Sequence, residues 1–477
     1  MNPKPPRSDM VVRSTIQPLA RGVAFGSLLL ASAITARWLF LQTRRIVLRP
    51  TPFTTPPLGP AAVEPQRRRI VVSDLHLGGG DRLDDFAEDA TFAAFLEHYV
   101  AGGAPTDLIL AGDSFEFLQI RLPTIADDDY SQAAALARIA VIVEAHSTFF
   151  AALARFVADP RHQVTLLIGN HDFELHYPAV KAHLAAALGL SPHDPRLRFG
   201  RDYHGGGVYI VHGNQFDVWN RFVNFGGISE PFEVVRGSQL VKEVINDLED
   251  DPLPFAALID NVKPTSALFW YLVALPRLRD AASRRFLARG LAGFFQVVAL
   301  PTPHHMPIDG RSPTSIRRRL QILNGLWQLV MRFRRGRVAR HREVARQVGA
   351  VAGVVEPPGS MLDQMQVEAV RQIERERRAF NDRFTREMQK IARQPQHQHD
   401  SFFVCGHTHL ARIVNLGHGQ TYFNVGTWTE IIQNVATMRR QEQRFPFLEI
   451  TYPHGPTPQA HLLVWNGPDE PPHLWHV

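Results

Sequence analysis

The chain has 477 residues, and its 52 basic and 46 acidic residues give a formal net charge of +6. A hydrophobic fraction of 45% and a charged fraction of 21% are typical of globular proteins. These values exclude a wholly disordered chain, a fibrous repeat and a polytopic membrane protein. The single cysteine, Cys405, excludes an internal disulfide bond and a cysteine-rich zinc module.

The N-terminal segment carries most of this net charge. Residues 1–50 contain eight basic residues and one acidic residue, so the rest of the chain is close to neutral. Residues 22–36 are uncharged, and Arg37 separates them from a second apolar stretch. A cleaved signal peptide, an uncleaved membrane anchor, an arginine-rich targeting peptide and an apolar surface helix would each fit this pattern. Basic residues on both flanks favour the anchor, so we expect membrane association through residues 1–49, with the cytoplasmic face favoured.

The next segments predict a linker and then an α/β domain. Residues 50–66 contain six prolines and predict a linker or extended arm. Short apolar runs that end in polar residues follow, and each run predicts a buried strand. The runs are residues 69–73, 108–111, 164–168, 208–211 and 402–405, with further strands expected at 422–424, 447–450 and 460–464. Helical stretches such as residues 133–157 separate the earlier runs, and this alternation indicates an α/β fold.

Residues 218–399 show no strand pattern and predict a long helical insertion. Apolar residues recur at a helical period between residues 316 and 330, and residues 361–393 predict a long charged helix. The insertion would split one catalytic domain into residues 67–217 and 400–477. We expect it to form a cap that binds the apolar or phosphate-rich part of a substrate. The alternative is a small helical core with a solvated basic face.

Five short motifs follow five of the predicted strands. They are Asp74-Leu75-His76, Gly112-Asp113-Ser114-Phe115-Glu116, Gly169-Asn170-His171-Asp172, Val211-His212-Gly213 and Gly406-His407-Thr408-His409. Functional groups collect beyond the carboxyl ends of strands in α/β sheets, so we expect the motifs to meet. Their carboxylate, imidazole and amide groups suit Mn²⁺, Zn²⁺, Fe²⁺ or Mg²⁺. They suffice for two ions about 3.5–4 Å apart, a pair that clamps the attacking and leaving oxygens of phosphoryl transfer.

Three nearby residues receive less specific interpretations. Asp172 either supports the ligands or is a turn residue. His204 stands beside three consecutive glycines and is expected to be a loop histidine. Cys405 is expected to be a buried strand thiol beside the site.

The five motifs resemble those of the calcineurin-like metallophosphoesterase superfamily, over residues 69–215 and 400–430. The resemblance implies an α/β fold of two packed mixed β-sheets flanked by helices. The metal ligands that it implies are Asp74, His76 and His409 for one ion, Asn170, His212 and His407 for the other, and Asp113 as the bridge between them. It also implies that His171 is the catalytic histidine, which stabilises the transition state or protonates the leaving oxygen. Glu116 matches the carboxylate that orients this histidine.

Within the superfamily, residues 73–78 and 112–117 are most similar to the UDP-2,3-diacylglucosamine hydrolase branch, which cleaves a pyrophosphate in a lipid A precursor. We therefore expect a phosphoesterase that hydrolyses a phosphodiester or pyrophosphate bond through attack of a metal-bridging hydroxide. Manganese is the favoured ion, with iron, zinc or magnesium as alternatives, and the substrate class is a lipid-linked or nucleotide conjugate. The alternatives are a nuclease, for which the arginines of residues 317–342 could supply a basic track, a protein phosphatase on the same scaffold, and a non-catalytic metal-binding scaffold.

Overall fold

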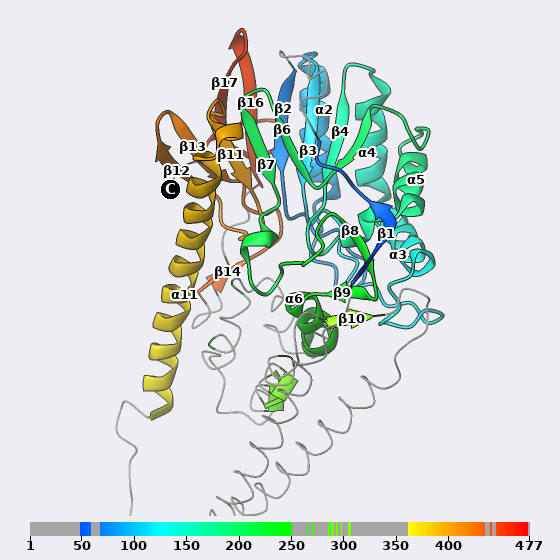
Figure 1. The fold of residues 1–477 in the computed structure, drawn as a ribbon, viewed down its shortest axis with the longest axis vertical. Helices are drawn as coiled ribbons and strands as arrows, with labels where there is room; N and C mark the ends of the chain where they lie inside the picture. Colours follow the sequence, from blue (N-terminus) through cyan, green and yellow to red (C-terminus); the bar gives the residue numbers. More distant parts are fainter. Residues whose placement is uncertain are drawn as a thin grey trace, which may run out of the picture.

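Two packed β-sheets form the centre of the molecule (Figure 1). The computed structural model describes residues 48–58, 67–249, 304–306, 361–434, 439–440 and 445–475, and isolated residues between 264 and 297. The predicted anchor, residues 1–49, lies almost wholly outside these ranges and stays a prediction. The predicted helical period at residues 316–330 also lies outside them.

The larger sheet has seven strands and combines parallel with antiparallel pairs. Its order is β18 (His473–Leu474), β17 (Thr457–Trp465), β16 (Phe445–His454), β2 (Arg68–Val72), β3 (Thr106–Ala111), β4 (Gln163–Leu167) and β5 (Leu197–Gly200). Strands β2 to β5 are parallel to one another, whereas β16 and β17 are antiparallel to their neighbours.

The smaller sheet has five strands and contains the last two ligand motifs. Its order is β12 (Arg412–Gly417), β13 (Gln420–Asn424), β11 (Phe402–Cys405), β7 (Val208–Val211) and β6 (Asp202–Gly205). Strand β11 runs parallel to both β13 and β7. The carboxyl ends of β7 and β11 therefore lie at the same edge of this sheet.

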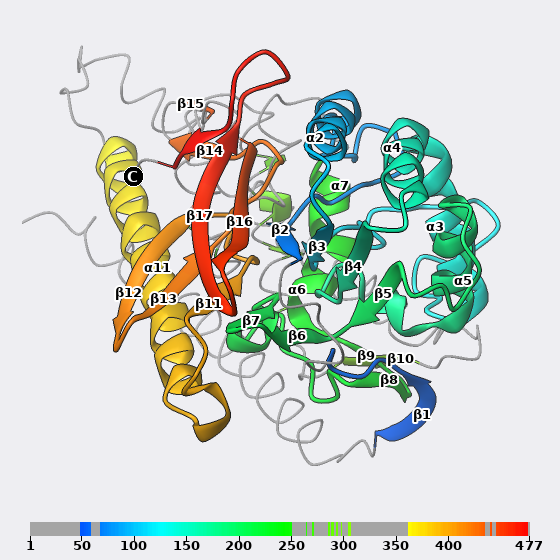
Figure 2. The same ribbon diagram turned by 90° about the horizontal axis from the view of Figure 1, so that it is seen from above.

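Helices cover the outer face of each sheet, as Figure 2 shows from above. On the larger sheet they are α2 (Asp89–Ala101), α3 (Gln132–Ala145), α4 (Ser147–Ala158) and α5 (Pro178–Ala187). The long helix α11 (Met361–Ala392) covers the smaller sheet. The two mixed sheets flanked by helices confirm the predicted fold class.

Alternating side chains of each central strand build different hydrophobic layers. In β2, Ile70 and Val72 pack with the helices α2 to α5, whereas Val71 packs between the two sheets. Strands that are covered on both faces must be apolar at almost every position, which explains the uninterrupted apolar runs in the sequence. A third layer joins Phe384 and Met388 of α11 to the outer face of the smaller sheet.

The segment whose sequence shows no strand pattern, residues 218–399, also contains short strands in its described part. Strand β8 (Gly227–Glu230) pairs with β1 (Arg49–Thr54), which lies at the start of the proline-rich arm, and β9 (Phe232–Val234) pairs with β10 (His304–Met306). These strands have three to six residues, and Pro231 separates β8 from β9. Such short runs carry little periodicity, and their pairing partners are distant in sequence. The segment then continues through α6 (Arg236–Leu240), the π-helical turn η3 (Val241–Ile245) and α7 (Asn246–Glu249).

The predicted helical stretch at residues 133–157 is two helices, because α3 ends and α4 begins at His146. Among the described residues, no single helix is both long and apolar enough to cross a membrane. Helices α3 and α4 meet the length and composition criteria only as a pair bent by 88°.

Candidate metal centre

The five motifs meet because they all leave strands at one edge of the sandwich. The motifs at Asp74 and Asp113 are joined by backbone hydrogen bonds from Asp74 N to Gly112 O (3.1 Å) and from His76 N to Asp113 O (3.0 Å). Across the two sheets, the Asp74 carboxylate accepts a hydrogen bond from His407 N (2.9 Å). These bonds fix the loops to one another before any ion is considered.

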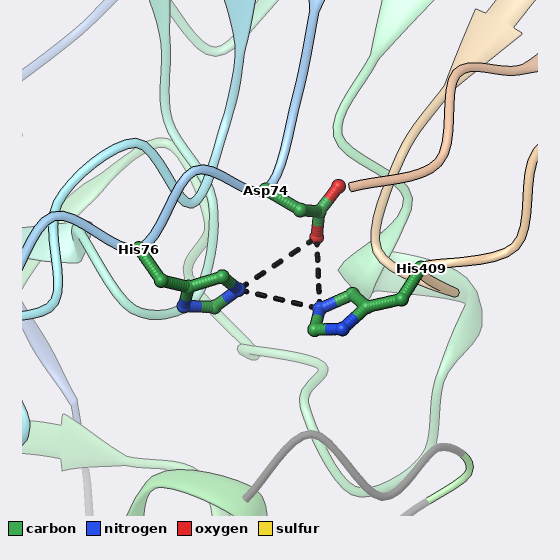
Figure 3. A group of neighbouring side chains, drawn as sticks. All are labelled: Asp74, His76 and His409. Carbon is green, nitrogen blue, oxygen red and sulfur yellow. Dashed lines mark hydrogen bonds and ion pairs between the residues drawn. The ribbon is translucent and has the colours of Figure 1, made fainter. Parts of the chain in front are cut away.

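The first ligand group contains Asp74, His76 and His409, which are all buried and point toward one another (Figure 3). His409 Nε2 lies 3.4 Å from Asp74 Oδ1 and 3.3 Å from His76 Nε2. His76 Nε2 lies 4.0 Å from the same Asp74 oxygen. One ion could therefore bind all three side chains, which are the three that the sequence predicted for the first metal.

The second ligand group contains Asp113, His212 and His407, and it is also buried. His212 Nε2 lies 3.0 Å from Asp113 Oδ2 and 3.2 Å from His407 Nδ1. His212 Nδ1 donates to the carbonyl oxygen of Ala111 at 3.0 Å, which leaves Nε2 to face the group. This tautomer is the one that an ion at this position requires.

Asn170 completes the set of side chains that the sequence predicted. Its neighbour His171 donates a backbone hydrogen bond to Asp113 Oδ1 at 2.8 Å, which places the Asn170 loop beside Asp113. The side-chain oxygen of Asn170 is buried and accepts no hydrogen bond from any described residue, whereas its nitrogen faces Asn220 Oδ1 at 3.5 Å. A buried amide oxygen without a donor is costly unless it has another partner, and a cation would be a suitable one.

The backbone is strained at most of these ligands. Five non-glycine residues of the two groups have left-handed φ angles: Asp74 (54°), His76 (52°), Asp113 (49°), His407 (65°) and His409 (56°). Each such residue costs on the order of 1–3 kcal/mol, and such residues cluster at binding and catalytic sites. The fold therefore maintains an arrangement of ligands that the isolated loops would not adopt.

Two glycines allow the loops to approach this closely. A Cβ at Gly169 would lie 2.1 Å from Asp113 Oδ1, and a Cβ at Gly406 would lie 2.2 Å from Asp74 Oδ2. Both distances are far shorter than a van der Waals contact. The glycines in the motifs thus have a steric role in addition to allowing turns.

Buried histidines keep the central carboxylates ionised. Burial alone would raise the pKa of Asp113, but the charges on His212 and His171 hold it well below its usual range. Burial would likewise raise the pKa of Asp74, but its hydrogen bond with His409 and the charge on His212 lower it. Both carboxylates therefore stay ionised, and bound divalent ions would supply the positive charge that the histidines otherwise provide.

Glu116 orients two histidines at once. Its Oε2 atom accepts hydrogen bonds from His76 Nδ1, at 2.8 Å, and from His171 Nδ1. Burial would raise the pKa of Glu116, but its interactions with His171 and His76 lower it to about 2. The three side chains are close enough to hold an ion. We interpret them as a hydrogen-bonded set instead, because His76 Nε2 already faces Asp74 and His409.

Asp217, which lies five residues beyond His212, was not among the predicted site residues. Its Oδ2 atom accepts hydrogen bonds from His407 Nε2 (3.1 Å) and from Asn220 Nδ2 (2.7 Å). The first bond leaves His407 Nδ1 to face the second ligand group. A carboxylate behind a metal-ligating histidine is a common arrangement, and it fixes both the tautomer and the ring orientation. The sequence pattern that could have indicated this role is an acidic residue a few positions after a histidine at the end of a strand.

Asp172 also supports the ligands, which was one of its two expected roles. Its Oδ1 accepts from Gly169 N at 2.6 Å, and its Oδ2 accepts from Ser114 N at 2.8 Å. The carboxylate therefore ties the loop that carries Asn170 to the loop that carries Asp113.

The replacement Asp217→Asn is expected to weaken binding of the second ion by about 10- to 100-fold, because His407 would lose the acceptor that fixes its ring. Turnover at saturating metal should be affected less than turnover at limiting metal. Metal titration of activity and calorimetric metal binding would measure both effects. Asp159→Asn, which removes a half-buried carboxylate paired with Arg161 away from the ligands, serves as the control. Equal metal affinity in the two variants would contradict this role.

His146 supports the loop that follows the first motif. Its Nε2 pairs with Asp84 Oδ2 at 2.9 Å and its Nδ1 with Asp89 Oδ2 at 3.0 Å. Asp84 in turn accepts hydrogen bonds from the backbone nitrogens of Gly78 and Gly80. Burial would lower the pKa of His146, but the bonds to Asp84 and Asp89 raise it to about 9.

This pairing predicts a pH-dependent stability. The pKa of His146 is raised from 6.5 to about 9. The contribution of the protonated ring to the free energy of unfolding is therefore complete below about pH 6.5 and is lost as the pH rises through about 9. A shift of this size corresponds to at most about 3 kcal/mol. The free energy of unfolding, measured with denaturant at about pH 6 and at about pH 9.5, should decrease between the two pH values. This decrease should be smaller for His146→Gln than for the wild type. The same decrease in both proteins would exclude the proposed pairing.

Comparison with known proteins agrees with this geometry. Residues 67–274 match the family model described as calcineurin-like phosphoesterase. This range contains the first four motifs and ends before His407 and His409. No curated protein matches the chain. The match does not extend to the UDP-2,3-diacylglucosamine hydrolase branch, which stays a prediction. Together with the buried histidine and aspartate groups, the match supports the calcineurin-like phosphoesterase superfamily for this domain and fits a metal-dependent phosphoesterase.

Proposed function

We propose that the protein hydrolyses a phosphodiester or pyrophosphate bond, with one divalent ion in each of the two ligand groups and Asp113 between them. The observation that carries this proposal is the position of His171. It is buried, its ring packs edge-to-face on His76 with centroids 4.7 Å apart, and its Nδ1 is engaged by Glu116. A site that only binds metal does not require an oriented histidine beside its ligands, whereas bond cleavage does.

The roles of the side chains follow from these contacts. When bound, divalent ions stabilise the charge on the attacking and leaving oxygens of phosphoryl transfer. Glu116 holds the proton of His171 on Nδ1, so that Nε2 is the nitrogen that exchanges a proton with the leaving oxygen. Asp217 and Glu116 fix the rings of His407 and His76, which reduces the reorganisation that the reaction requires.

Contacts of the insertion support a role in substrate binding. Gly237 N, in α6, donates to Trp219 O at 2.8 Å, close to the Asp217 that holds His407. Asn246 Nδ2, in α7, donates to Leu118 O at 3.0 Å, just beyond Glu116. The insertion thus folds back on its own first residues, which directly follow Asp217, and contacts the loop that follows Glu116. We propose that it covers the site and binds the rest of a lipid-linked or nucleotide conjugate.

An activity screen with added Mn²⁺ tests this function. It should cover phosphomonoesters, phosphodiesters, sugar-nucleotide pyrophosphates and DNA, with the Asp113→Asn protein as the blank. We expect metal-dependent turnover of a diester or a pyrophosphate that exceeds turnover of every monoester. Turnover of monoesters alone, or no turnover by protein shown to contain metal, would contradict the proposal. Efficient cleavage of DNA would favour the nuclease alternative.

A further inference from the structure

A second cluster of metal-ligating side chains lies at the opposite end of the smaller sheet. His204 lies on β6, and His397 and Asp400 lie between α11 and β11. Asp400 Oδ2 is 2.8 Å from His204 Nε2 and 2.7 Å from His397 Nδ1. The expectation that His204 is a loop histidine was wrong, because the glycines beside it form the turn between β6 and β7 while His204 itself pairs with Tyr209 in the sheet.

This cluster is separate from the candidate metal centre. Asp400 precedes β11, whereas His407 follows it, and β11 has four residues (Phe402–Cys405). At about 3.3 Å per residue, the strand separates the two positions by more than about 10 Å. No ligand of the metal centre contributes to the cluster among the described residues.

The burial of Asp400 requires positive charge. Its side chain is 6% exposed, and its partners among the described residues are both imidazoles. Asp202, two residues before His204 on the same strand, is not part of this group, because its Oδ2 pairs with Arg201 Nε at 3.5 Å. The Asp400 carboxylate is therefore a buried acidic group between two imidazole rings, and a buried charge needs a counter-charge or a metal ion.

The surroundings hold these groups in place. Gln420 Nε2 donates to the carbonyl oxygens of His397 (3.1 Å) and Asp400 (3.0 Å), which fixes the turn between them. The ring of Tyr209 packs edge-to-face on His397 with centroids 4.6 Å apart. The side chain of His204 is 33% exposed and leaves a route from solvent. Glu116 also lies between two histidines, but there both histidines are buried within the catalytic loops.

We infer that His204, His397 and Asp400 form a structural cation site of the zinc class, which ties the end of the insertion to the catalytic sheet. Two imidazole nitrogens with carboxylate oxygens suit Zn²⁺ better than Mg²⁺ or Ca²⁺, which prefer oxygen ligands alone. A bound ion would neutralise Asp400 and would join the segment after α11 to β6.

Zinc binding by matched histidine variants tests this inference. His397→Ala and His204→Ala each remove one ligand, whereas His399→Ala changes an exposed histidine of the same turn and leaves the cluster intact. All three keep the catalytic motifs, so differences in bound Zn²⁺ isolate the proposed site. We expect equilibrium dialysis to show one zinc equivalent fewer per chain in the first two variants than in His399→Ala and the wild type. Affinity at this site should decrease by at least about 10- to 100-fold.

Two further measurements make the outcome decisive. Zn²⁺ should raise the unfolding temperature of His399→Ala more than that of His204→Ala. Because His204→Ala keeps the buried His397, this comparison remains possible even when His397→Ala does not fold. Diffraction at the zinc absorption edge should show a peak beside Asp400. Equal zinc content in all variants would overturn the inference. An anomalous peak at the catalytic site without one at Asp400 would do the same, and the cluster would then be only a set of hydrogen-bonded side chains. Because these readouts do not use activity, they stand independently of the proposed function.

Discussion

Replacement of Asp113 by asparagine is expected to abolish turnover and to remove most of the metal bound at the catalytic site. The Asp113 carboxylate is fully buried, its Oδ2 faces His212 Nε2, and its Oδ1 accepts the backbone hydrogen bond of His171. An amide keeps the shape of this group but removes the negative charge that both ions would share. Elemental analysis and turnover at increasing Mn²⁺ would measure the two losses.

A matched control separates this effect from general damage. Asp107→Asn makes the same chemical change six positions earlier, in β3, where the carboxylate accepts a hydrogen bond from Thr165 Oγ1 at 2.9 Å and lies away from the ligands. Mn²⁺ at 100 times its dissociation constant would stabilise a binding protein by about 2.7 kcal/mol. This stabilisation should persist in Asp107→Asn and be largely lost in Asp113→Asn. Full metal content and turnover in Asp113→Asn would show that Asp113 does not bridge two ions.

Replacement of His171 by alanine is expected to lower turnover by roughly 10²- to 10⁴-fold, the usual contribution of a positioned general acid or base. Metal content should stay close to that of the wild type, because His76 and His409 keep their contacts with Asp74. Measurement of both quantities on the same preparation tests the assignment. The loss of both ions would instead make His171 a ligand.

Glu116→Gln and His183→Ala refine this test. Glutamine at position 116 can still accept one hydrogen bond but replaces the charge-assisted bond to His171 with a weaker neutral one. It should therefore lower turnover, because the ring of His171 is held less firmly. His183 lies on α5, outside the motifs, and its replacement should change neither turnover nor metal content. Unchanged turnover in Glu116→Gln would contradict the orienting role of Glu116.

The sequence predicted the centre of the fold because each central strand is covered on both faces. Val71, packed between the sheets, and Ile70 and Val72, packed under helices, produce a continuous apolar run that can be recognised without knowledge of its partners. The parallel order of the strands then brings the motifs to one edge. The structure places all nine predicted site residues there, and their binding of metal stays a prediction.

The remaining features depend on contacts that local patterns do not encode. Asp217 is an acid in an irregular loop, and its role appears only when β11 brings His407 beside it. Strands β8 and β9 are too short to show a period, and β1 lies within a proline-rich arm. His204 alternates with Tyr203 on a four-residue edge strand, and the neighbouring glycines obscured this pattern. In each case the stabilising partner is distant in the sequence.

Diffraction from crystals containing Mn²⁺, recorded at the manganese absorption edge, tests the central claim most directly. We expect two anomalous peaks about 3.5–4 Å apart, one on either side of the Asp113 carboxylate. One peak should lie among Asp74, His76 and His409, and the other among Asn170, His212 and His407. A single peak, or a peak between Glu116 and His171, would contradict the two-ion site.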